Sequence, residues 1–440
     1  MKKTFLLSCL MLAAMPVMAA YTGHVYVDKN KNGVFDQSEK PLAGIKVSDG
    51  LNVVETAADG SFTLPGHERE RFIFITTPSG YKTFNRHYHK IEKKQSGYDF
   101  GLIPYSGRIR KDGSHRYIHI TDTEIFNTEN HADWVNNVRD YARNEQAAFI
   151  IHTGDICYEK GLKAHIKLMN TENMDCPVFY CIGNHDLVKG KYGEELFESI
   201  YGPVYYSFDA GNVHYVVTPM PGGDHAPGYT SDDVCRWLKN DLAHIRPGTP
   251  VVVFNHDLLT YEDTFIFKSK NAGSINLNEY NLKAWVYGHW HINYMKKQGD
   301  VYSVCTSSLD KGGIDHSTTA FRVMHVDSKG DFTSELRYTY LDKNICIASP
   351  AGVMASGVLP VAVNVYSSVS PVREVLYTCL ADGKPVLKNK RLLQSTDWSW
   401  NGELPLSHKY VGKELTLRVT ARFNNGEIAE AESNFICRTE

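Results

Sequence analysis

A chain of 440 residues is too long for one ordinary domain, and two to three domains are expected. Its composition, 42% hydrophobic and 22% charged, is that of a globular protein. The formal net charge is -3, and basic and acidic residues are mixed along the chain, which argues against a nucleic-acid-binding surface.

The N-terminus has the pattern of a secretory signal peptide. Lys2 and Lys3 precede an apolar stretch that ends at the small residues Ala19 and Ala20. The stretch is too short to span a membrane, and too short before Cys9 for a lipid-attachment site. No later segment is apolar enough to span a bilayer. We therefore expect residues 1–20 to be cleaved and the mature protein to be exported, to the periplasm, the extracellular space or the cell surface.

The remaining cysteines are scattered and include no CxxC pair. Export permits disulfides, but this spacing is not that of a disulfide-dense scaffold. We expect most of the cysteines to be buried thiols, and a bridge between Cys379 and Cys437 is an alternative that the sequence leaves open. The eight residues are Cys157, Cys176, Cys181, Cys235, Cys305, Cys346, Cys379 and Cys437.

Three regions of the chain differ in their sequence patterns. Residues 21–104 carry short alternating runs separated by Gly, Asp and Pro, which predicts an all-β module. Residues 105–345 alternate apolar strand runs with helical stretches, which predicts an α/β domain whose sheet is partly buried on both faces. Short strands return in residues 346–440 and predict a β-sandwich. Helices are expected around residues 131–145, 161–170, 191–200 and 231–244.

The first module contains a segment, DKNKNGVFDQSE, that fits the twelve-position calcium loop, with Gly33 at the sharp turn. The flanking residues have strand patterns, so the segment predicts a structural calcium ion in a β-module rather than a helix-loop-helix sensor. The alternative is an Asn/Gly turn with incidental acidic residues. The predicted ligands are the side chains of Asp28, Asn30, Asn32 and Glu39 and the carbonyl oxygen of Val34.

Five polar clusters follow apolar strands of the central region. The carboxyl ends of strands form the edge of an α/β sheet where ligands bind, so we expect these clusters to converge. In VYGHWHINY the two histidines are two residues apart and point to one side of an extended segment, as suits a metal ion. Taken singly, each cluster has a plain alternative, such as surface histidines or a helix cap. The clusters are ITDTE with Asp122 and Glu124, HTGD with Asp155, GNHD with Asn184, His185 and Asp186, FNHD with His256, and GHWH with His289 and His291.

The order of these motifs resembles that of the calcineurin-like metallophosphoesterase family, over roughly residues 115–326. The β-module before this region and the sandwich after it resemble the flanking domains of a secreted branch of the family. The resemblance implies an α/β core in which two mixed sheets pack between helices, with an all-β domain at each end of the chain.

The resemblance also implies a pair of divalent metal ions. The carboxylate of Asp155 has two oxygens and would bridge the ions. Two ions about 3.5–4 Å apart can clamp a phosphate and generate a hydroxide nucleophile near neutral pH. One ion would also take Asp122 and His291, and the other would also take Asn184, His256 and His289.

The same resemblance assigns His185 to catalysis, as a cation facing the phosphoryl oxygens or as the acid that protonates the leaving oxygen. Asp186 would orient His185. A serine or cysteine nucleophile is not needed, and the chain contains neither G-x-S-x-G nor a P-loop.

Glu124 departs from the family pattern, which usually has histidine at the second position of D-x-H. We expect Glu124 to ligate, which would add negative charge and favour a harder ion such as Mn, Fe or Mg. The alternative is that Glu124 misses the metal and leaves that site weak. Taken over all the ligands, the metal pair is expected to be two divalent ions of the transition type, Mn, Fe or Zn, and the doubt over Glu124 leaves their identity open.

The segment PMPGGDHAPGY has the Gly and Pro content of a loop, and we expect it over the same edge of the sheet. His225 and Tyr229 of this loop, and His316 further along, are candidates for substrate contact. For each of them the alternative is an ordinary surface residue.

These observations predict an exported three-domain phosphoesterase that acts on a phosphate monoester or diester. The aromatic content and the flanking β-domains suit a phosphorylated glycan or envelope polymer, and a nucleotide or cyclic nucleotide is the rival substrate. The alternative from another class is a non-catalytic surface protein that binds glycan or envelope polymer and in which the metals are structural. The sequence leaves the oligomeric state and the roles of the flanking domains open.

Overall fold

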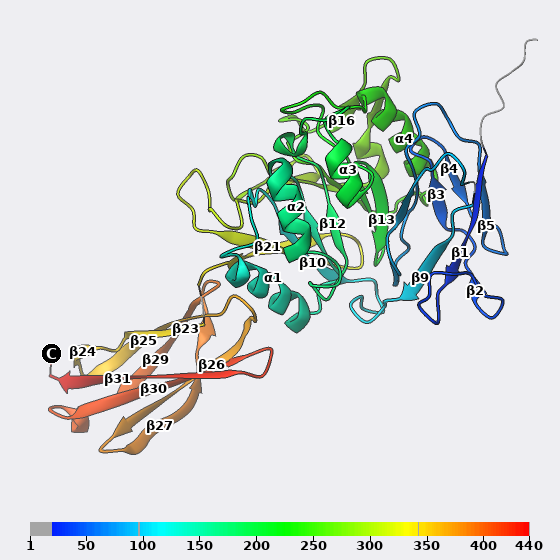
Figure 1. Ribbon diagram of the computed structural model, residues 1–440. Helices are drawn as coiled ribbons and strands as arrows, with labels where there is room; N and C mark the ends of the chain where they lie inside the picture. Colours follow the sequence, from blue (N-terminus) through cyan, green and yellow to red (C-terminus); the bar gives the residue numbers. More distant parts are fainter. Residues whose placement is uncertain (1–19, 96, 342, 440) are drawn as a thin grey trace, which may run out of the picture.

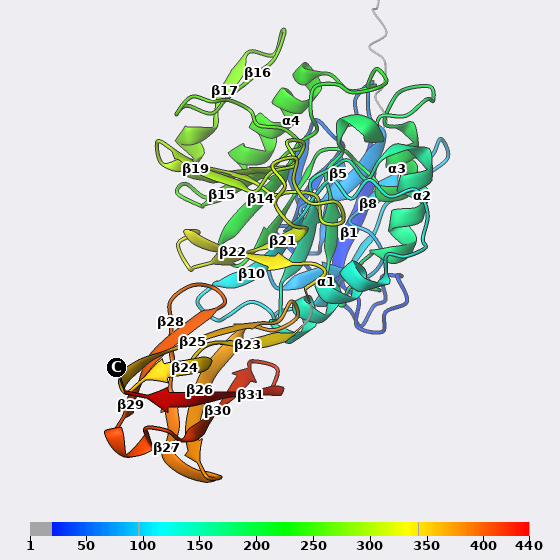
Figure 2. The ribbon, with the colours of Figure 1, turned by 90° about the vertical axis from the view of Figure 1, so that its left-hand side faces the viewer.

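The computed structural model describes residues 20–95, 97–341 and 343–439. The predicted signal peptide lies outside the described residues, apart from its last position, Ala20. The chain forms a central α/β domain with a β-rich module packed on one side and a second β-rich domain that projects from it (Figures 1 and 2). This arrangement confirms the predicted fold class.

The N-terminal module consists of two small sheets around a core that includes Val25, Phe62 and Ile73. The module packs on the central domain. Its strand β6 lies against β13 (Tyr206–Ala210), and Arg71 forms an ion pair with Glu194 at 2.8 Å. Its first sheet has β2 (Lys40–Pro41), β1 (Tyr21–Val27), β9 (Phe100–Pro104) and β7 (Tyr81–Thr83) in this order, with β5 (Ser61–Leu64) also paired to β1. Its second sheet has β4 (Val53–Glu55), β3 (Lys46–Ser48), β6 (Phe72–Ile75) and β8 (Tyr88–Lys90).

The central domain contains two mixed sheets. The first sheet has the order β12 (Val178–Tyr180), β11 (Phe149–His152), β10 (His115–Ile120), β21 (Ala320–Val326) and β22 (Phe332–Tyr338). The second has the order β13 (Tyr206–Ala210), β14 (Val213–Val217), β15 (Val251–Phe254), β18 (Leu282–Tyr287), β20 (Val301–Cys305) and β19 (Tyr294–Gln298). In both sheets the strands that precede the polar clusters run parallel, so their carboxyl ends lie at one edge.

The helices of the central domain agree with the expected helical stretches. They are α1 (Ala132–Asn144), α2 (Tyr158–Leu168), α3 (Glu195–Tyr201) and α4 (Ser231–Ala243). The side chain of Thr230 caps α4 by accepting a hydrogen bond from the amide of Asp233. Shorter elements complete the domain: η1 (Asn184–Asp186), η2 (Leu277–Tyr280), β16 (Ile266–Lys268) and β17 (Ser274–Asn276).

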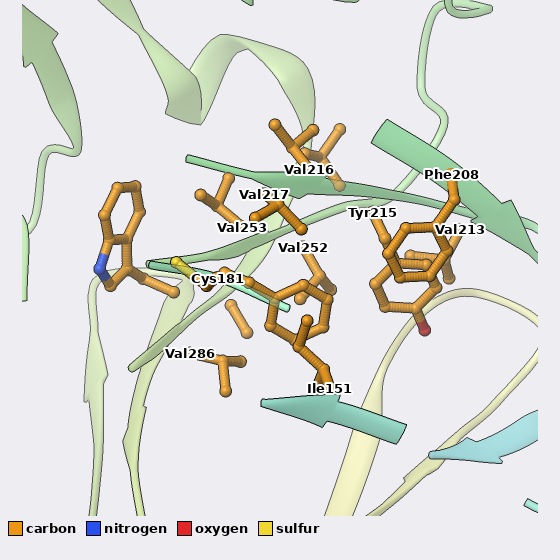
Figure 3. Packing of buried hydrophobic residues seen from close by; sticks show 14 of the residues in the cluster. Ile151, Cys181, Phe208, Val213, Tyr215, Val216, Val217, Val252, Val253 and Val286 are labelled. Carbon is orange, nitrogen blue, oxygen red and sulfur yellow. The ribbon is translucent and has the colours of Figure 1, made fainter. Parts of the chain in front are cut away.

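The largest hydrophobic core lies between the two sheets of the central domain (Figure 3). Ile151 of β11 faces Val217 of β14 and Val252 of β15 across the space between the sheets, and each of the three is at most 1% exposed. Strands β14 and β15 are buried at every position, which explains their continuous apolar runs. The rigid core therefore fixes the strand ends that carry the polar clusters.

The C-terminal domain is built of two sheets that enclose Val363, Val375, Trp400 and Leu417. One sheet has β23 (Asn344–Ser349), β25 (Gly357–Tyr366), β29 (Ser399–Leu406) and β28 (Leu393–Gln394). The other has β24 (Gly352–Ala355), β31 (Ile428–Arg438), β30 (Glu414–Phe423), β26 (Val372–Ala381) and β27 (Lys384–Arg391), and the single turn η3 (His408–Tyr410) follows β29. The guanidinium of Arg337 lies over the rings of Tyr141 and Tyr366 and joins this domain to the centre.

The eight cysteines within the described residues are all free thiols, and seven of them are buried. The Cys379–Cys437 bridge, which the sequence left open, is therefore not formed in this structure. None of the helices in the described residues has the length and apolarity needed to cross a lipid bilayer.

Candidate metal centre

The five polar clusters converge at one edge of the central domain, as the sequence predicted. Each cluster lies in the loop that follows a strand. Asp122 and Glu124 follow β10, Asp155 follows β11, Asn184 and His185 follow β12, His256 follows β15, and His289 and His291 follow β18. The first three loops belong to one sheet and the last two to the other, so both sheets contribute side chains to the centre.

The backbone at this edge is strained. Five of the predicted metal ligands have positive φ angles, a region that residues other than glycine enter rarely and at a cost of about 1–3 kcal/mol each. A conformation of this kind persists only where the surrounding structure enforces it, and it turns each side chain inward directly after its strand. The five residues are Asp122 (49°), Glu124 (44°), Asp155 (56°), His289 (65°) and His291 (50°).

The glycines of the motifs allow the loops to approach one another. A Cβ atom on Gly183 would lie 2.2 Å from the amide nitrogen of Asp155, and one on Gly288 would lie 1.9 Å from the hydroxyl of Thr121. Gly154, with φ of 100°, would meet His256 Nδ1 at 2.7 Å. Any side chain at these positions would push the metal-ligating loops apart, which explains why glycine stands there in GD, GNH and GH.

One group of ligands forms around Asp122. Its Oδ1 lies 3.3 Å from His291 Nε2, and Glu124 Oε1 lies 3.4 Å from the same nitrogen. The hydroxyl of Thr121 donates to Asp122 Oδ2 at 2.7 Å, and the amide of His289 donates to the same oxygen at 3.0 Å. These donors fix the Asp122 carboxylate and leave its Oδ1 facing the imidazole.

A second group forms around His256. The ligand atoms of Asp155, His256 and His289 lie within 4.8 Å of one another. His256 Nδ1 donates to the carbonyl oxygen of Thr153 at 2.7 Å, which leaves Nε2 directed at Asp155 Oδ2, 3.1 Å away. Despite this distance the geometry is not that of a hydrogen bond, and Nε2 has no hydrogen-bond partner among the described residues.

Asn184 supplies a second buried atom that lacks a partner. Its side-chain oxygen is buried and accepts no hydrogen bond within the described part of the chain. A buried acceptor of this kind costs about 1–3 kcal/mol unless something satisfies it. A cation would satisfy both this oxygen and the Nε2 of His256, so the residues present fit a metal site.

The electrostatics of the centre also favour cations. Burial would lower the pKa of His256, but the charge of Asp155 outweighs burial and raises it to about 10. The hydrogen bond that His291 donates to the Asp122 carboxylate raises the pKa of His291, and the charge of His256 lowers the pKa of Asp155 although burial opposes this. The cluster of carboxylates therefore holds positive charge strongly, and metal ions would take the place of these protons.

Glu124 lies between two cationic groups. One carboxylate oxygen faces His291, and the other forms an ion pair with the ammonium of Lys311, a residue that the sequence did not single out. Ligand atoms of Glu124, Asp155 and Cys157 also lie within 4.8 Å of one another. Burial raises the pKa of the Cys157 thiol, so Cys157 is held as a neutral thiol. The Glu124 oxygen that faces His291 is therefore the one placed to ligate a metal.

His185 is oriented by a residue other than the one predicted. Its Nδ1 donates to Asp224 Oδ2 at 2.8 Å, whereas Asp186 is fully buried and accepts hydrogen bonds from the amides of Gly183 and Cys157. Burial and the charge of Asp155 raise the pKa of Asp186 to about 7. Asp186 therefore braces two loops of the centre, and the prediction that it orients His185 is wrong.

The loop of residues 219–229 lies over the centre, as predicted, but the residue that contacts the centre is Asp224 rather than His225 or Tyr229. Asp224 donates a backbone hydrogen bond to the carbonyl of Asn184 at 3.0 Å. Tyr229 is buried, and its hydroxyl donates to the carbonyl of Met220, so the structure contradicts its proposed substrate contact. His225 and His316 are both exposed, and their proposed contacts stay predictions.

The calcium-loop segment connects β1 and β2, which pair as antiparallel strands, as the sequence predicted for its flanks. Asp28 and Glu39 are buried. Asp28 accepts hydrogen bonds from the amides of Asn32 and Gly33, and Glu39 accepts them from Lys29 and Asp36. Val34 is exposed, and the side-chain oxygens of Asn30 and Asn32 accept backbone hydrogen bonds inside the loop. The segment is thus a closed turn whose carboxylates keep free lone pairs.

Two other features lie away from the centre. Asp49, His67 and Glu70 form a cluster with metal-ligand spacing, but they already bond to one another's backbone, to Asn52 and to Tyr21. A cavity of about 310 Å³ lies where the N-terminal module meets the central domain, near Tyr105 and Phe179. It lies at the opposite ends of β11 and β12 from the polar clusters.

Comparisons with known proteins agree with this geometry. The family model described as N terminal of Calcineurin-like phosphoesterase matches residues 29–104, and the model described as Calcineurin-like phosphoesterase matches residues 115–293. Purple acid phosphatase 13 of Arabidopsis thaliana is 26% identical over 215 residues, which make up 46% of this chain and 36% of the plant protein.

Solved structures with low overall similarity include an archaeal phosphodiesterase, at 13% identity and a TM-score of 0.27, covering 50% of this chain and 99% of the other. Vps29 of Entamoeba histolytica in complex with Zn²⁺ covers 51% of this chain and 99% of its own, at 10% identity and a TM-score of 0.26. The two family models match the module and the central domain in the order that the motifs predicted. The chain therefore belongs to the calcineurin-like phosphoesterase family, a family of metal-dependent phosphoester hydrolases.

Proposed function

We propose that this protein is an exported phosphoesterase that uses two metal ions to hydrolyse a phosphate monoester or diester. The observation that carries the proposal is the convergence of two ligand groups on Asp155, together with two buried atoms without partners, Asn184 Oδ1 and His256 Nε2. The similarity to the calcineurin-like phosphoesterase models supports the same reaction class.

The proposal assigns each ligand group to one ion, with Asp155 shared. Two bound divalent ions would supply Lewis acidity toward the phosphate oxygens and toward water. The mixed donors, carboxylate, amide oxygen and imidazole, suit Mn, Fe or Zn. The first group is Asp122, Glu124, Asp155 and His291, and the second is Asp155, Asn184, His256 and His289.

His185 and Asp224 complete the proposed machinery. Because Nδ1 of His185 donates to the Asp224 carboxylate, Nε2 is the nitrogen that can face a substrate. Burial would lower the pKa of His185, but the hydrogen bond to Asp224 outweighs it and raises the pKa, which favours the imidazolium. The imidazolium can donate to a phosphoryl oxygen and can give its proton to the leaving oxygen when the ester bond breaks.

This pair also favours an enzyme over the alternative of a non-catalytic binding protein. The side chains of His185 and Asp224 are 33% and 38% exposed, and an ion pair with this exposure adds little to stability. A reason to hold an imidazole beside a metal-ligand loop in this way is proton transfer at the centre.

Two further parts of the proposal concern location and calcium. The pattern of residues 1–20 supports export to the periplasm, the extracellular space or the cell surface, and a calcium ion in the loop from Asp28 to Glu39 would brace the N-terminal module. Mass analysis of the protein from cell fractions tests export. An uncleaved chain confined to the cytoplasm would contradict it.

The reaction is tested with the purified chain on 4-nitrophenyl phosphate and bis(4-nitrophenyl) phosphate, with added Mn²⁺ and with chelator. We expect turnover that depends on metal and is lost in His185→Ala, while the metal content of that variant matches the wild type. Equal rates with and without metal, or full activity in the variant, would contradict the proposal.

A further inference from the structure

Two pairs of stacked aromatic rings flank the candidate metal centre; Tyr261, Phe126 and Tyr158 are exposed and Trp290 is half-buried. The first pair is Tyr261 and Trp290, whose ring centroids lie 5.9 Å apart with an angle of 24° between the ring planes. It lines a cavity of about 490 Å³ that also includes His289, Leu258 and Ile314. Tyr261 and Ile314 are both 75% exposed, so apolar surface is open directly beside a candidate metal ligand.

Contacts of Trp290 with two residues of the central domain fix the position of this first pair. The indole nitrogen of Trp290 donates to the carboxylate of Asp257 at 3.0 Å, and its ring packs edge-on against the buried Tyr287 at 5.1 Å. Trp290 therefore presents a rigid surface, and Tyr261 extends it toward solvent.

The second pair is Phe126 and Tyr158, whose rings stack at 6.1 Å with an angle of 16°. Phe126 is 53% exposed and Tyr158 is 42% exposed. The ring of Tyr158 lies 5.3 Å from the imidazole of His185, and the ammonium of Lys311 lies 5.9 Å from the ring of Phe126. This pair therefore adjoins the side of the centre that carries the proposed proton donor.

The two pairs come from different sheets. Phe126 and Tyr158 follow β10 and β11 of the first sheet, and Tyr261 and Trp290 follow β15 and β18 of the second. Exposed large apolar rings are unfavourable in water, and clusters of them beside a polar site mark ligand contacts. An arrangement with one flat pair from each sheet suits a ligand that extends from the metals in two directions.

We propose that the substrate is a phosphodiester in which each of the two alcohol groups carries a ring, one ring on each aromatic pair. This inference rests on the proposed function. A monoester has one organic group and could cover one pair only. Flat stacked pairs suit flat faces, and both a sugar ring and a nucleoside base present such a face.

The position of His185 determines which of the two ester bonds breaks. The oxygen of a water molecule forms a bond to phosphorus and releases a proton to solvent, the bond from phosphorus to the leaving oxygen breaks, and His185 gives its proton to that oxygen and regains one from solvent. The leaving alcohol therefore lies on Phe126 and Tyr158, beside His185. The alcohol that stays on the phosphate lies on Tyr261 and Trp290.

The test uses three esters that all release 4-nitrophenol: 4-nitrophenyl phosphate, methyl 4-nitrophenyl phosphate and bis(4-nitrophenyl) phosphate. For each ester, kcat/KM of the variant is divided by that of the wild type, so the different intrinsic reactivities of the esters cancel. We expect Tyr261→Ala to lower kcat/KM for the two-ring diester about three- to tenfold more than for the methyl diester, the size of a lost ring contact. We expect Phe126→Ala to lower kcat/KM for both diesters, because the leaving ring is common to them.

Leu393→Ala serves as the matched control, since Leu393 is 72% exposed on β28 of the C-terminal domain. It should leave all three rates at the wild-type level. Because Tyr261 and Phe126 are exposed, their truncation does not disturb a packed core.

Equal losses on both diesters in Tyr261→Ala, or no loss in either aromatic variant, would overturn this inference while leaving the proposed function intact. Absence of metal-dependent turnover on all three esters would instead overturn the proposed function, and this inference with it. Two further diesters separate the ring types: the 4-nitrophenyl ester of thymidine 5′-phosphate and that of glucose 6-phosphate. The diester whose kcat/KM falls more in Tyr261→Ala carries the type of ring that the first pair binds. An unchanged kcat/KM on both diesters would count against the inference.

Discussion

His185 Nδ1 lies 2.8 Å from Oδ2 of Asp224, a residue 39 positions further along the chain. The contact joins the loop after β12 to the loop that follows β14, and the amide of Asp224 also donates to the carbonyl of Asn184. One residue therefore orients the proposed proton donor and braces a neighbouring metal ligand loop.

Replacement of Asp224 by Asn should lower kcat about 10- to 100-fold on phosphate esters, because the imidazole loses the carboxylate that orients it and favours its charge. Asp224 is not among the metal ligands, so the metal content should equal that of the wild type. Steady-state kinetics and elemental analysis of the same preparation check both parts. Asp382→Asn, an exposed site in the C-terminal domain, is the control. Unchanged kcat in Asp224→Asn would show that the pair is only a surface contact.

Asn184→Ala should reduce metal occupancy at one of the two sites and suppress hydrolysis. The substitution removes the buried side-chain oxygen that lacks a protein partner. Elemental analysis after dialysis against limiting Mn²⁺ measures the occupancy, and Asn173→Ala, an exposed asparagine, is the matched control. Full metal content together with full activity would remove Asn184 from the ligand set.

Glu124→His should shift the metal preference from manganese toward zinc, because imidazole is a softer donor than carboxylate. The change also leaves Lys311 without its ion-pair partner, so Glu124→Gln is needed to separate the loss of charge from the new ligand. Competition between Zn²⁺ and Mn²⁺, read by elemental analysis, gives the preference. Identical ratios in the wild type and both variants would mean that Glu124 does not ligate.

The buried His214 should make stability depend on pH. Burial alone would lower its pKa, but the charge of Asp241 and the hydrogen bond to Asp209 outweigh burial and raise it to about 9. The raised pKa means that this stabilisation is complete below about pH 6.5, the pKa in the unfolded chain, and is lost as pH rises through 9.

His214→Gln should therefore lower the free energy of unfolding by about 3 kcal/mol at pH 6, with a smaller loss at pH 10. Urea unfolding at the two pH values measures both. His408→Gln, at an exposed histidine, should change neither value. A loss for His214→Gln that stays constant with pH would show that His214 does not titrate in the folded protein.

Calcium at a hundredfold excess over its dissociation constant should stabilise the folded N-terminal module by about 2.7 kcal/mol and raise its melting temperature. Glu39→Gln should abolish this response, because it removes the charge of the bidentate position. Calorimetry with Ca²⁺ and with EGTA measures the shift, and Mg²⁺ at the same concentration is the control for ionic strength. A melting temperature that is the same in Ca²⁺ and EGTA would favour the plain Asn/Gly turn.

The sequence alone determined the fold class and the residues that converge at the centre. Apolar strand runs have a fixed period, and each motif stands directly after such a run, so its place at the carboxyl edge of the sheet follows from chain order. The same local logic identified the strands on both sides of the calcium-loop segment and the four helices of the central domain.

Only the tertiary structure decided which residues surround that centre. Asp224, Lys311 and the four aromatic residues that flank the metals reach it from loops that sequence spacing does not connect. Tyr229 and Asp186 were misjudged for the same reason, since burial depends on what packs against a residue and not on its neighbours in the chain. Local patterns are set by backbone geometry, whereas the partner of a side chain is set by loops that meet only after the sheets have packed.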